Sequence, residues 1–401
     1  MTSLTQLLAS TAALSDQKSR LEQYRKAVDQ AFASTDPVDS CRDLIDHMLS
    51  DDVPLVISRQ LLQTLAQEIG KLPPAQHGPV ATLALEKIQP HIVSFEDTVT
   101  IIRENYAELL EKEECWSKAA QVLAGIDLDS GMRNIDPAYK LQKNIKIAML
   151  YLEDDDPVNA ELYIKKASSL INNSKDAAAE LQYKVCYARI LDSKRRFLEA
   201  ALRYYELSSA GGHVGQRVDA EDLQQALTQA ITCTILASAG PQRSRMLSTL
   251  YKDERAEQLP VYPFLEKVFL ERILRRSEVE AFSQTLRPHQ MAQLPDGSTV
   301  LERAVMQHNL LSASKLYNNI SITELGNLLG VSPEKAESTA ADMISDGRLH
   351  AIIDQVHGII SFDEKAEALQ QWDLQVQSIC AKVNEIIDSM AGDAAQALTA
   401  R

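Results

Sequence analysis

The chain has 401 residues, enough for two or three domains, and its 41 basic and 56 acidic residues give a formal net charge of -15. Because nucleic acids and anionic membranes are themselves negatively charged, this charge argues against either as the main partner. With 45% hydrophobic residues, mostly aliphatic, and only 14 Gly and 14 Pro, the composition predicts a mostly helical globular protein.

The sequence contains no pattern that indicates catalysis or metal binding. No apolar run approaches the length of a membrane span and no basic leader precedes the first apolar segment, so we expect a protein of the cytoplasm and nucleus. Five scattered cysteines form no CxxC pair, and eight histidines form no HxH or HExxH. GxSxG, P-loop and GxGxxG motifs are also missing. We therefore predict no catalytic residue, no metal and no cofactor.

Residues 1–94 contain several amphipathic segments and are predicted to form helical repeats of irregular spacing. The segments are "LTQLLAS", "SRLEQYRKAVDQAF", "DSCRDLIDHMLS", "SRQLLQTLAQEIG" and "ATLALEKIQ".

Residues 95–300 begin with a repeated pattern of small residues between bulky ones. Alanines recur at spacings of 40 to 41 residues in two series: Ala107, Ala148 and Ala188, and Ala119, Ala160 and Ala200. A period near 40 is typical of solenoids of paired helices, similar to TPR repeats, in which small residues allow close helix packing. We predict at least three helical hairpins over residues 95–210, then a loop at the glycine cluster 211–215, and further helices that lead into a bundle.

Two charged segments in this region are open to a functional interpretation. The acidic run 152–157 is predicted to be a solvated turn, with Asp156 capping the helix that starts at Pro157. The basic residues Arg243, Arg245, Lys252 and Arg255 could bind phosphate or an acidic protein surface. Because Asp253 and Glu254 are interleaved with them, ion pairs within the chain are favoured.

Residues 301–363 are predicted to contain a winged helix. Ser321 with Glu324 forms a capping box before a helix from Ile322, and Gly330 can end that helix. A second helix starts at Ser332-Pro333 and ends near Gly347. The apolar runs 349–353 and 359–362 then predict a β-hairpin.

The predicted second helix of the winged helix is acidic. Residues 333–346 contain four carboxylates and a single lysine, and this charge would repel a phosphate backbone. We therefore interpret the winged helix as a protein-docking module, with these candidate contact residues in its hairpin: Leu349, Ile353, Ile359 and Phe362.

Residues 364–392 are predicted to be a helix that packs with partner helices, followed by a tail at 393–401. Apolar residues alternate at steps of 3 and 4 over three heptads, which favours a coiled coil or a bundle over packing on the helix's own domain. This seam consists of Leu369, Trp372, Val376, Ile379, Val383, Ile386 and Met390. A helix folded back on the solenoid is the alternative.

Several stretches resemble a known family. Helical repeats that run into a winged helix resemble the PCI-domain proteins, which are shared by the proteasome lid, the COP9 signalosome and a translation initiation complex. Within these, the chain is similar to the subunit 4 family of the COP9 signalosome from about residue 55 to residue 390. The stretches that carry the similarity are "LEKIQP", "YLEDDDPV", "KVCYAR", "TILASAGPQRSRML", "YKDER" and "HNLLSASKLYNNI".

This resemblance implies a non-catalytic scaffold and substrate-sensing subunit of the complex that removes a ubiquitin-like modifier from cullins. The implied partners are other PCI subunits, a pair of metalloprotease subunits, and a neddylated cullin-RING ligase as substrate. An adaptor that binds nucleic acid, or a subunit of a related lid-type complex, remains as an alternative.

Overall fold

The computed structural model describes residues 11, 17–32, 37–50, 53–128, 135–172, 176–209, 219–294, 297–362 and 372–386. These residues are mostly helical with one small sheet, which confirms the predicted fold class. The chain divides into two compact units, Met1–Lys194 and Arg195–Arg401. None of the described helices is both long enough and apolar enough to cross a membrane.

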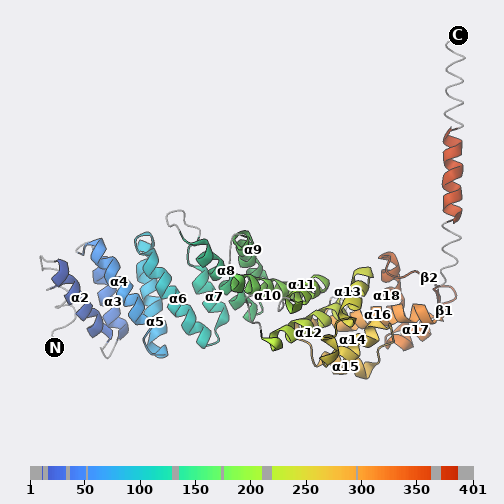
Figure 1. The fold of residues 1–401 in the computed structure, drawn as a ribbon, viewed down its shortest axis with the longest axis horizontal. Helices are drawn as coiled ribbons and strands as arrows, with labels where there is room; N and C mark the ends of the chain where they lie inside the picture. Colours follow the sequence, from blue (N-terminus) through green and yellow to red (C-terminus); the bar gives the residue numbers. More distant parts are fainter. Residues whose placement is uncertain are drawn as a thin grey trace, which may run out of the picture. The chain divides into compact units, whose positions relative to one another are not determined.

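The first unit is a series of helices in which each helix packs on its neighbours in the chain (Figure 1). The segment "LTQLLAS" lies outside the described residues, and the other amphipathic segments predicted before residue 95 are helical. The helices are α2 (Gln17–Phe32), α3 (Pro37–Leu49), α4 (Leu55–Ile69), α5 (Pro74–Ile88), the 3-10 helix η1 (Gln89–Ser94), α6 (Glu96–Lys112), α7 (Trp116–Ala124), α8 (Pro137–Glu153), α9 (Pro157–Ile171) and α10 (Ala177–Ser193).

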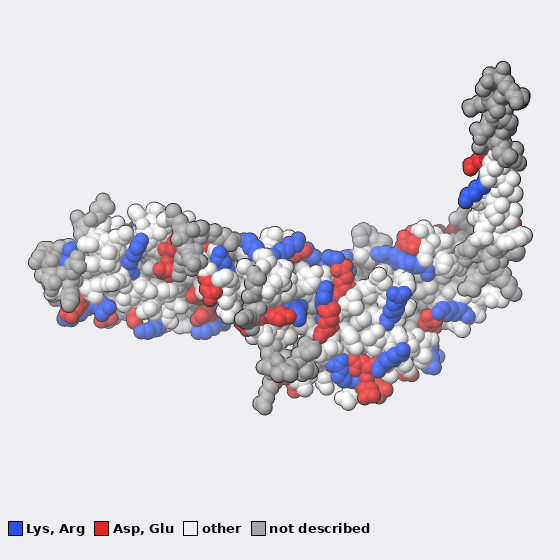
Figure 2. Space-filling model, turned by 45° about the horizontal axis from the view of Figure 1, so that its top comes forward, with Lys and Arg blue, Asp and Glu red and all other residues white. Residues whose placement is uncertain are grey.

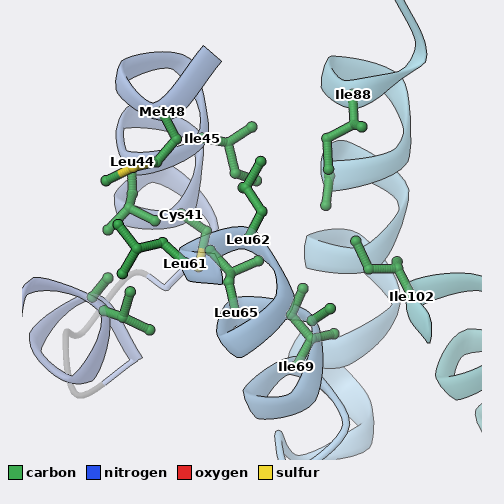
Figure 3. Packing of buried hydrophobic residues seen from close by; sticks show 14 of the residues in the cluster. Cys41, Leu44, Ile45, Met48, Leu61, Leu62, Leu65, Ile69, Ile88 and Ile102 are labelled. Atoms are coloured by element: carbon green, nitrogen blue, oxygen red, sulfur yellow. The ribbon is translucent and has the colours of Figure 1, made fainter. Parts of the chain in front are cut away.

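The core of the first repeats is formed by aliphatic side chains at helical spacing. One face of α3 and one face of α4 bury their apolar residues against each other, and Ile88 of α5 and Ile102 of α6 extend the same cluster (Figure 3). Burial of each such side chain contributes about 1.5–3 kcal/mol. The residues labelled on α3 and α4 are Cys41, Leu44, Ile45, Met48, Leu61, Leu62, Leu65 and Ile69.

The alanine series of the repeats is buried as predicted. The side chains of Ala107, Ala119, Ala148, Ala160, Ala188 and Ala200 are all 0% exposed. The backbone repeats as well, because Glu114, Asp155 and Arg195 have positive φ values of 58, 56 and 61°. Each of these three residues follows the end of a helix, at spacings that match those of the alanines. A left-handed residue at this place ends one helix and lets the chain turn into the next.

The helix starts of the repeats are capped by aspartates. The Asp156 carboxylate accepts hydrogen bonds from the backbone N–H groups of Val158 and Asn159, both at 3.1 Å, which confirms the predicted cap of α9. These bonds hold the pKa of Asp156 below its usual value. Asp136 and Asp176 cap α8 and α10 in the same manner.

The second unit begins with a helical bundle built around α16 (Val300–Leu316). The predicted glycine loop 211–215 lies outside the described residues. The other helices of the bundle are α11 (Phe197–Ser209), α12 (Ala220–Leu236), α13 (Pro241–Tyr251), η3 (Ala256–Gln258), α14 (Tyr262–Phe269), α15 (Arg276–Ser283) and η4 (Pro288–Met291).

Polar side chains of α16 hold the loops of this bundle. His308 Nε2 lies 2.9 Å from the carbonyl oxygen of Arg272, and Ser312 Oγ donates to the His308 carbonyl at 3.0 Å. The Asn309 amide accepts from the Leu274 N–H at 2.9 Å and donates to the Leu274 carbonyl at 3.2 Å. Buried polar groups must find partners, and here they fix the segment between α14 and α15.

The winged helix follows α16 and ends in a three-stranded sheet. Its elements are β1 (Asn319–Ser321), α17 (Ile322–Leu329), α18 (Pro333–Ser345), β2 (Ile352–Asp354) and β3 (Ile359–Ser361). The strand order is β1-β3-β2, and both pairings are antiparallel. The prediction of a two-stranded wing was therefore incomplete, because β1 pairs with β3 on the side opposite to β2.

Candidate functional site

The helical part of the winged helix forms as its caps predict. Ser321 Oγ accepts from the N–H of Glu324 at 3.2 Å, and Ser332 Oγ accepts from the N–H of Lys335 at 3.4 Å. Gly330 has a φ of 70°, which ends α17 in the left-handed conformation that favours glycine. These local signals define α17 and α18 as two helices joined by a short turn, and the two helices pack on each other.

Two of the four predicted hairpin residues belong to the core. Leu349 is 3% exposed and Phe362 is 7% exposed, and both pack with Leu325, Met343 and Ile360. Their side chains therefore fix the sheet on the helices and do not face a partner in this structure. The sequence pattern selected them because residues that anchor a sheet are as apolar as residues that contact a partner.

The other two residues are half-buried: Ile353 lies on the edge strand β2, and Ile359 lies on the central strand β3, opposite Asp354 of β2. β2 is an edge strand, and its Ile352 side chain is 51% exposed. At the tip of the wing, Val356 is 91% exposed. An edge strand with exposed apolar side chains can accept a further strand from another protein. Contact of this hairpin with a partner stays a prediction.

The wing turn is shaped by one aspartate. The Asp354 carboxylate accepts from the N–H groups of Val356 and His357 at 3.0 and 3.1 Å, and it lies 2.7 Å from His357 Nδ1. The hydrogen bond from the His357 side chain lowers the pKa of Asp354 most, followed by the backbone bonds. The carboxylate therefore stays ionised at neutral pH and gives the tip of the wing an acidic group.

The electrostatics of the winged helix do not match a nucleic acid. Residues 333–346 carry four acidic side chains and one lysine, and the nearby Arg348 pairs with Asp346. On the face that Figure 2 shows, basic and acidic side chains are interspersed over the surface. Binding to a phosphate backbone requires several unpaired cations on one surface. This winged helix presents acidic groups in their place.

Two of the four basic residues between 243 and 255 form contacts inside the second unit, and the other two, Arg245 and Lys252, are exposed. Arg243 is buried and donates from Nε to the Thr234 carbonyl at 3.0 Å and from Nη2 to the Ile235 carbonyl at 3.1 Å. Arg255 pairs with Asp253 at 2.7 Å. The predicted internal pairing is confirmed for Arg255, whereas Arg243 binds backbone carbonyls and no carboxylate.

The predicted seam lies on a helix over residues 372–386, whose described side chains are all exposed. Leu369 and Met390 lie outside the described residues. The exposed fractions of the other seam residues are 64% for Trp372, 41% for Val376, 62% for Ile379, 47% for Val383 and 59% for Ile386. Apolar side chains at this spacing, uncovered in the single chain, favour packing against helices of another protein.

The described residues contain no group of three or more His, Cys, Asp or Glu side chains that could hold a metal ion. Cys41, Cys186 and Cys233 are buried thiols, and burial raises the pKa of Cys186 to about 12 and of Cys41 to about 11. Cys115 is half-buried, and Cys380 is exposed on the seam helix.

The whole chain is similar to known proteins. The family model described as PSMD12/CSN4, N-terminal, matches residues 1–212, and the PCI domain model matches residues 279–364. The chain is 56% identical to COP9 signalosome complex subunit 4 of Arabidopsis thaliana, over 97% of this chain and 98% of that protein. The chain belongs to the COP9 signalosome subunit 4 family.

Relatives from other kingdoms carry the same name. The proteins named COP9 signalosome complex subunit 4 from Dictyostelium discoideum and Drosophila melanogaster are each 46% identical to this chain. These matches cover 97% and 93% of this chain, and 97% and 91% of the two relatives. The PCI match encloses the winged helix and ends before the seam helix, so the two candidate surfaces lie inside and beyond the PCI domain, respectively.

Proposed function

We propose that this chain is a non-catalytic scaffold and substrate-sensing subunit of the COP9 signalosome, and that it supports removal of the ubiquitin-like modifier from cullins. The observation that carries the proposal is the similarity over nearly the whole chain to proteins named as subunit 4 of this complex. In this role the chain would regulate cullin-RING ubiquitin ligases, and it would act in the cytoplasm and the nucleus.

The chain joins the assembly through two surfaces. The first is the open edge of β2, which offers backbone N–H and C=O groups to a strand of a neighbouring PCI subunit, with Ile353 on this strand and Ile359 beside it on β3 as side-chain contacts. The second is the seam of helix 372–386, which packs with helices of other subunits, including the metalloprotease pair. The two surfaces bind by different interactions. The first forms backbone hydrogen bonds between strands, and the second buries apolar side chains.

The helical repeats of the first unit face the substrate, a neddylated cullin-RING ligase. Stacked helical hairpins present a long surface on a rigid core, which suits recognition of a large partner. Substrate sensing then consists of binding the ligase with the repeats while the second unit holds the chain in the assembly.

The test compares the tagged full chain with a version that ends at Phe362, both isolated from the native cells at moderate salt and analysed by mass spectrometry. We expect the full chain to bring down PCI subunits and a metalloprotease pair, and the shortened chain to lose most of them. The shortened chain keeps the described winged-helix core, so loss of partners reports on the seam helix. Isolation of both versions alone, or with nucleic acid only, would contradict the proposal.

A further inference from the structure

A cavity of about 430 Å³ lies within the second unit, and its lining includes no residue of β2 or of the seam helix. Its walls come from five places in the chain: the start of α11, the connection from α12 to α13, the segment before α16, the first turns of α16 and the segment after α18. None of the functions described above uses this cavity.

The charge of the cavity is opposite to that of the whole chain. Among the described residues, four arginines line it, Arg195, Arg196, Arg303 and Arg348, together with one carboxylate, that of Glu199. The chain as a whole has a net charge of -15. A concentration of guanidinium groups in a concave site of an acidic protein attracts anions to that site.

Two of these arginines are neutralised within the chain. Arg196 donates to the Glu199 carboxylate from Nε at 2.9 Å and from Nη2 at 2.6 Å. Arg348 pairs with Asp346, and its Nη1 also lies 3.4 Å from Oε1 of Gln307, a buried residue of the cavity wall. These bonds hold the two side chains in place.

The other two arginines are not neutralised. Within the described part of the chain, neither Arg195 nor Arg303 forms an ion pair, and both are exposed. The two positive charges of these arginines would neutralise one ligand that carries two negative charges. Arginine suits such a ligand because its planar fork can donate two parallel hydrogen bonds to one phosphate.

The backbone adds to the positive potential of the cavity. The first turns of α11 and α13 contribute Phe197 and Gln242 to its lining. The N-cap of α13 is Gly240, which has no side chain to bond the free N–H groups of that turn. The positive ends of two helix dipoles therefore lie at the cavity.

The floor of the cavity is apolar. Phe197, Leu236, Ala237, Val300 and Ala304 line it and are all buried. A free inorganic anion would leave this floor without a contact, whereas an organic group next to the anion would cover it. The lining thus fits a ligand with a charged end and an apolar body.

We propose that this cavity binds a phosphate monoester dianion carried on an organic group, with Arg195 and Arg303 as the main phosphate contacts. The phosphate comes from a phosphorylated protein side chain or from a small phosphorylated metabolite, and both present the same group to the arginines. The proposal does not depend on membership of a complex.

The test measures binding of three probes to the purified full chain by titration calorimetry at low salt: phenyl phosphate, inorganic phosphate, and a blocked peptide with phosphoserine between leucines. We expect phenyl phosphate and the phosphopeptide, or one of the two, to bind more tightly than inorganic phosphate. Tighter binding of the peptide would point to a protein source, and tighter binding of phenyl phosphate to a metabolite.

Variants locate the site. Arg303→Gln and Arg195→Gln are each expected to weaken binding about tenfold or more, because each removes a charge-assisted hydrogen bond. Arg303→Lys keeps the positive charge but lacks the planar guanidinium group, so it should weaken binding less than Arg303→Gln does. Arg245→Gln removes an exposed arginine of α13 that does not line the cavity, so binding should be unchanged.

The ionisation of the ligand gives an independent readout. The second pKa of a phosphate monoester is about 6, so the affinity for phenyl phosphate should fall between about pH 7.5 and about pH 5.5. Benzenesulfonate keeps a single charge and should show no such fall. The protein groups that face the ligand are the four arginines and Glu199, with Asp346 behind Arg348. Absence of binding, or equal binding by all the variants, would overturn the proposal.

Discussion

His308 is a titratable side chain in the interior of the second unit. It is 3% exposed, and burial lowers its pKa to about 4, with the buried Arg243 adding to the effect. A neutral imidazole suits this place because Arg243 already brings a positive charge into the same core. His308 can then serve as a fixed hydrogen-bond partner for the loop at Arg272.

This burial predicts a loss of stability in acid. As pH falls from about 6.5 to about 4, the unfolded chain takes up a proton at residue 308 while the folded chain does not. The free energy of unfolding should fall over this window by an amount on the order of 3 kcal/mol, and the contribution is fully present above about pH 6.5. Urea unfolding of the full chain at several pH values measures it.

A substitution isolates this residue. His308→Gln can still bond the Arg272 carbonyl but cannot titrate, so its stability should change less between about pH 6.5 and about pH 4 than that of the unaltered chain. His350→Gln removes an exposed histidine of the same unit and should leave the pH dependence unchanged. Equal pH dependence in all three proteins would show that His308 is not kept neutral by folding.

Gly326 of α17 lies close to the backbone of the turn that leads into α18. A Cβ at this position would lie 3.0 Å from the carbonyl oxygen of Val331 and 3.2 Å from the nitrogen of Pro333. Both atoms belong to the backbone of the turn into α18, so they cannot move aside as a flexible side chain can. Glycine here sets the distance between the helices and thereby the position of the sheet that packs on them.

Gly326→Ala is therefore expected to destabilise the winged helix by about 1–3 kcal/mol, the usual cost of overpacking. Asn327→Ala is a matched control in the same helix, because Asn327 is exposed and its replacement should change the free energy of unfolding by no more than about 0.5 kcal/mol. Thermal unfolding of both variants measures the two effects, and an equal change in both would contradict the packing argument.

The sequence was sufficient for elements whose signals are local. The caps at Ser321, Ser332 and Asp156 were predicted because each depends on residues within one helical turn, and the buried alanines were predicted because they recur at a regular spacing along the chain. β1 was missed because three residues give no strand period, and its partner β3 follows about 40 residues later. The pairing of two strands that lie this far apart in the sequence depends on tertiary contacts, which a local sequence pattern does not contain.

The candidate surfaces were predictable in part. A heptad pattern is local, so the sequence alone was enough to predict the seam. The seam residues from Trp372 to Ile386 are exposed, as a partner-binding helix requires. The pattern could not tell whether Leu349 and Phe362 face the core or a partner. The arginine-lined cavity gave no sequence signal, because its residues are spread from position 195 to position 348 and only folding brings them together.

For the whole molecule, the proposed function separates binding of substrate from assembly. The first unit has two successive clusters of buried residues between its stacked helices, and the second unit carries the winged helix and the seam helix. Five exposed apolar side chains along the described part of the seam are costly in water unless a partner covers them. Assembly through this helix is therefore the central claim of the account.

The most direct test of this claim compares two double variants of the seam helix in native cells. Ile379→Asp with Val383→Asp places charges on the seam, and Gln377→Asp with Asn384→Asp places the same number of charges on the opposite face of the helix. All four side chains are exposed in the single chain, so neither change should alter its folding, which circular dichroism can check.

The measurement is the amount of PCI and metalloprotease subunits that co-isolate with each tagged variant, by quantitative mass spectrometry. The account predicts a loss of about tenfold or more for the seam variant, because a buried charge in a helix bundle costs several kcal/mol, and little change for the control. Equal recovery of partners with both variants would contradict the assignment of this helix to assembly.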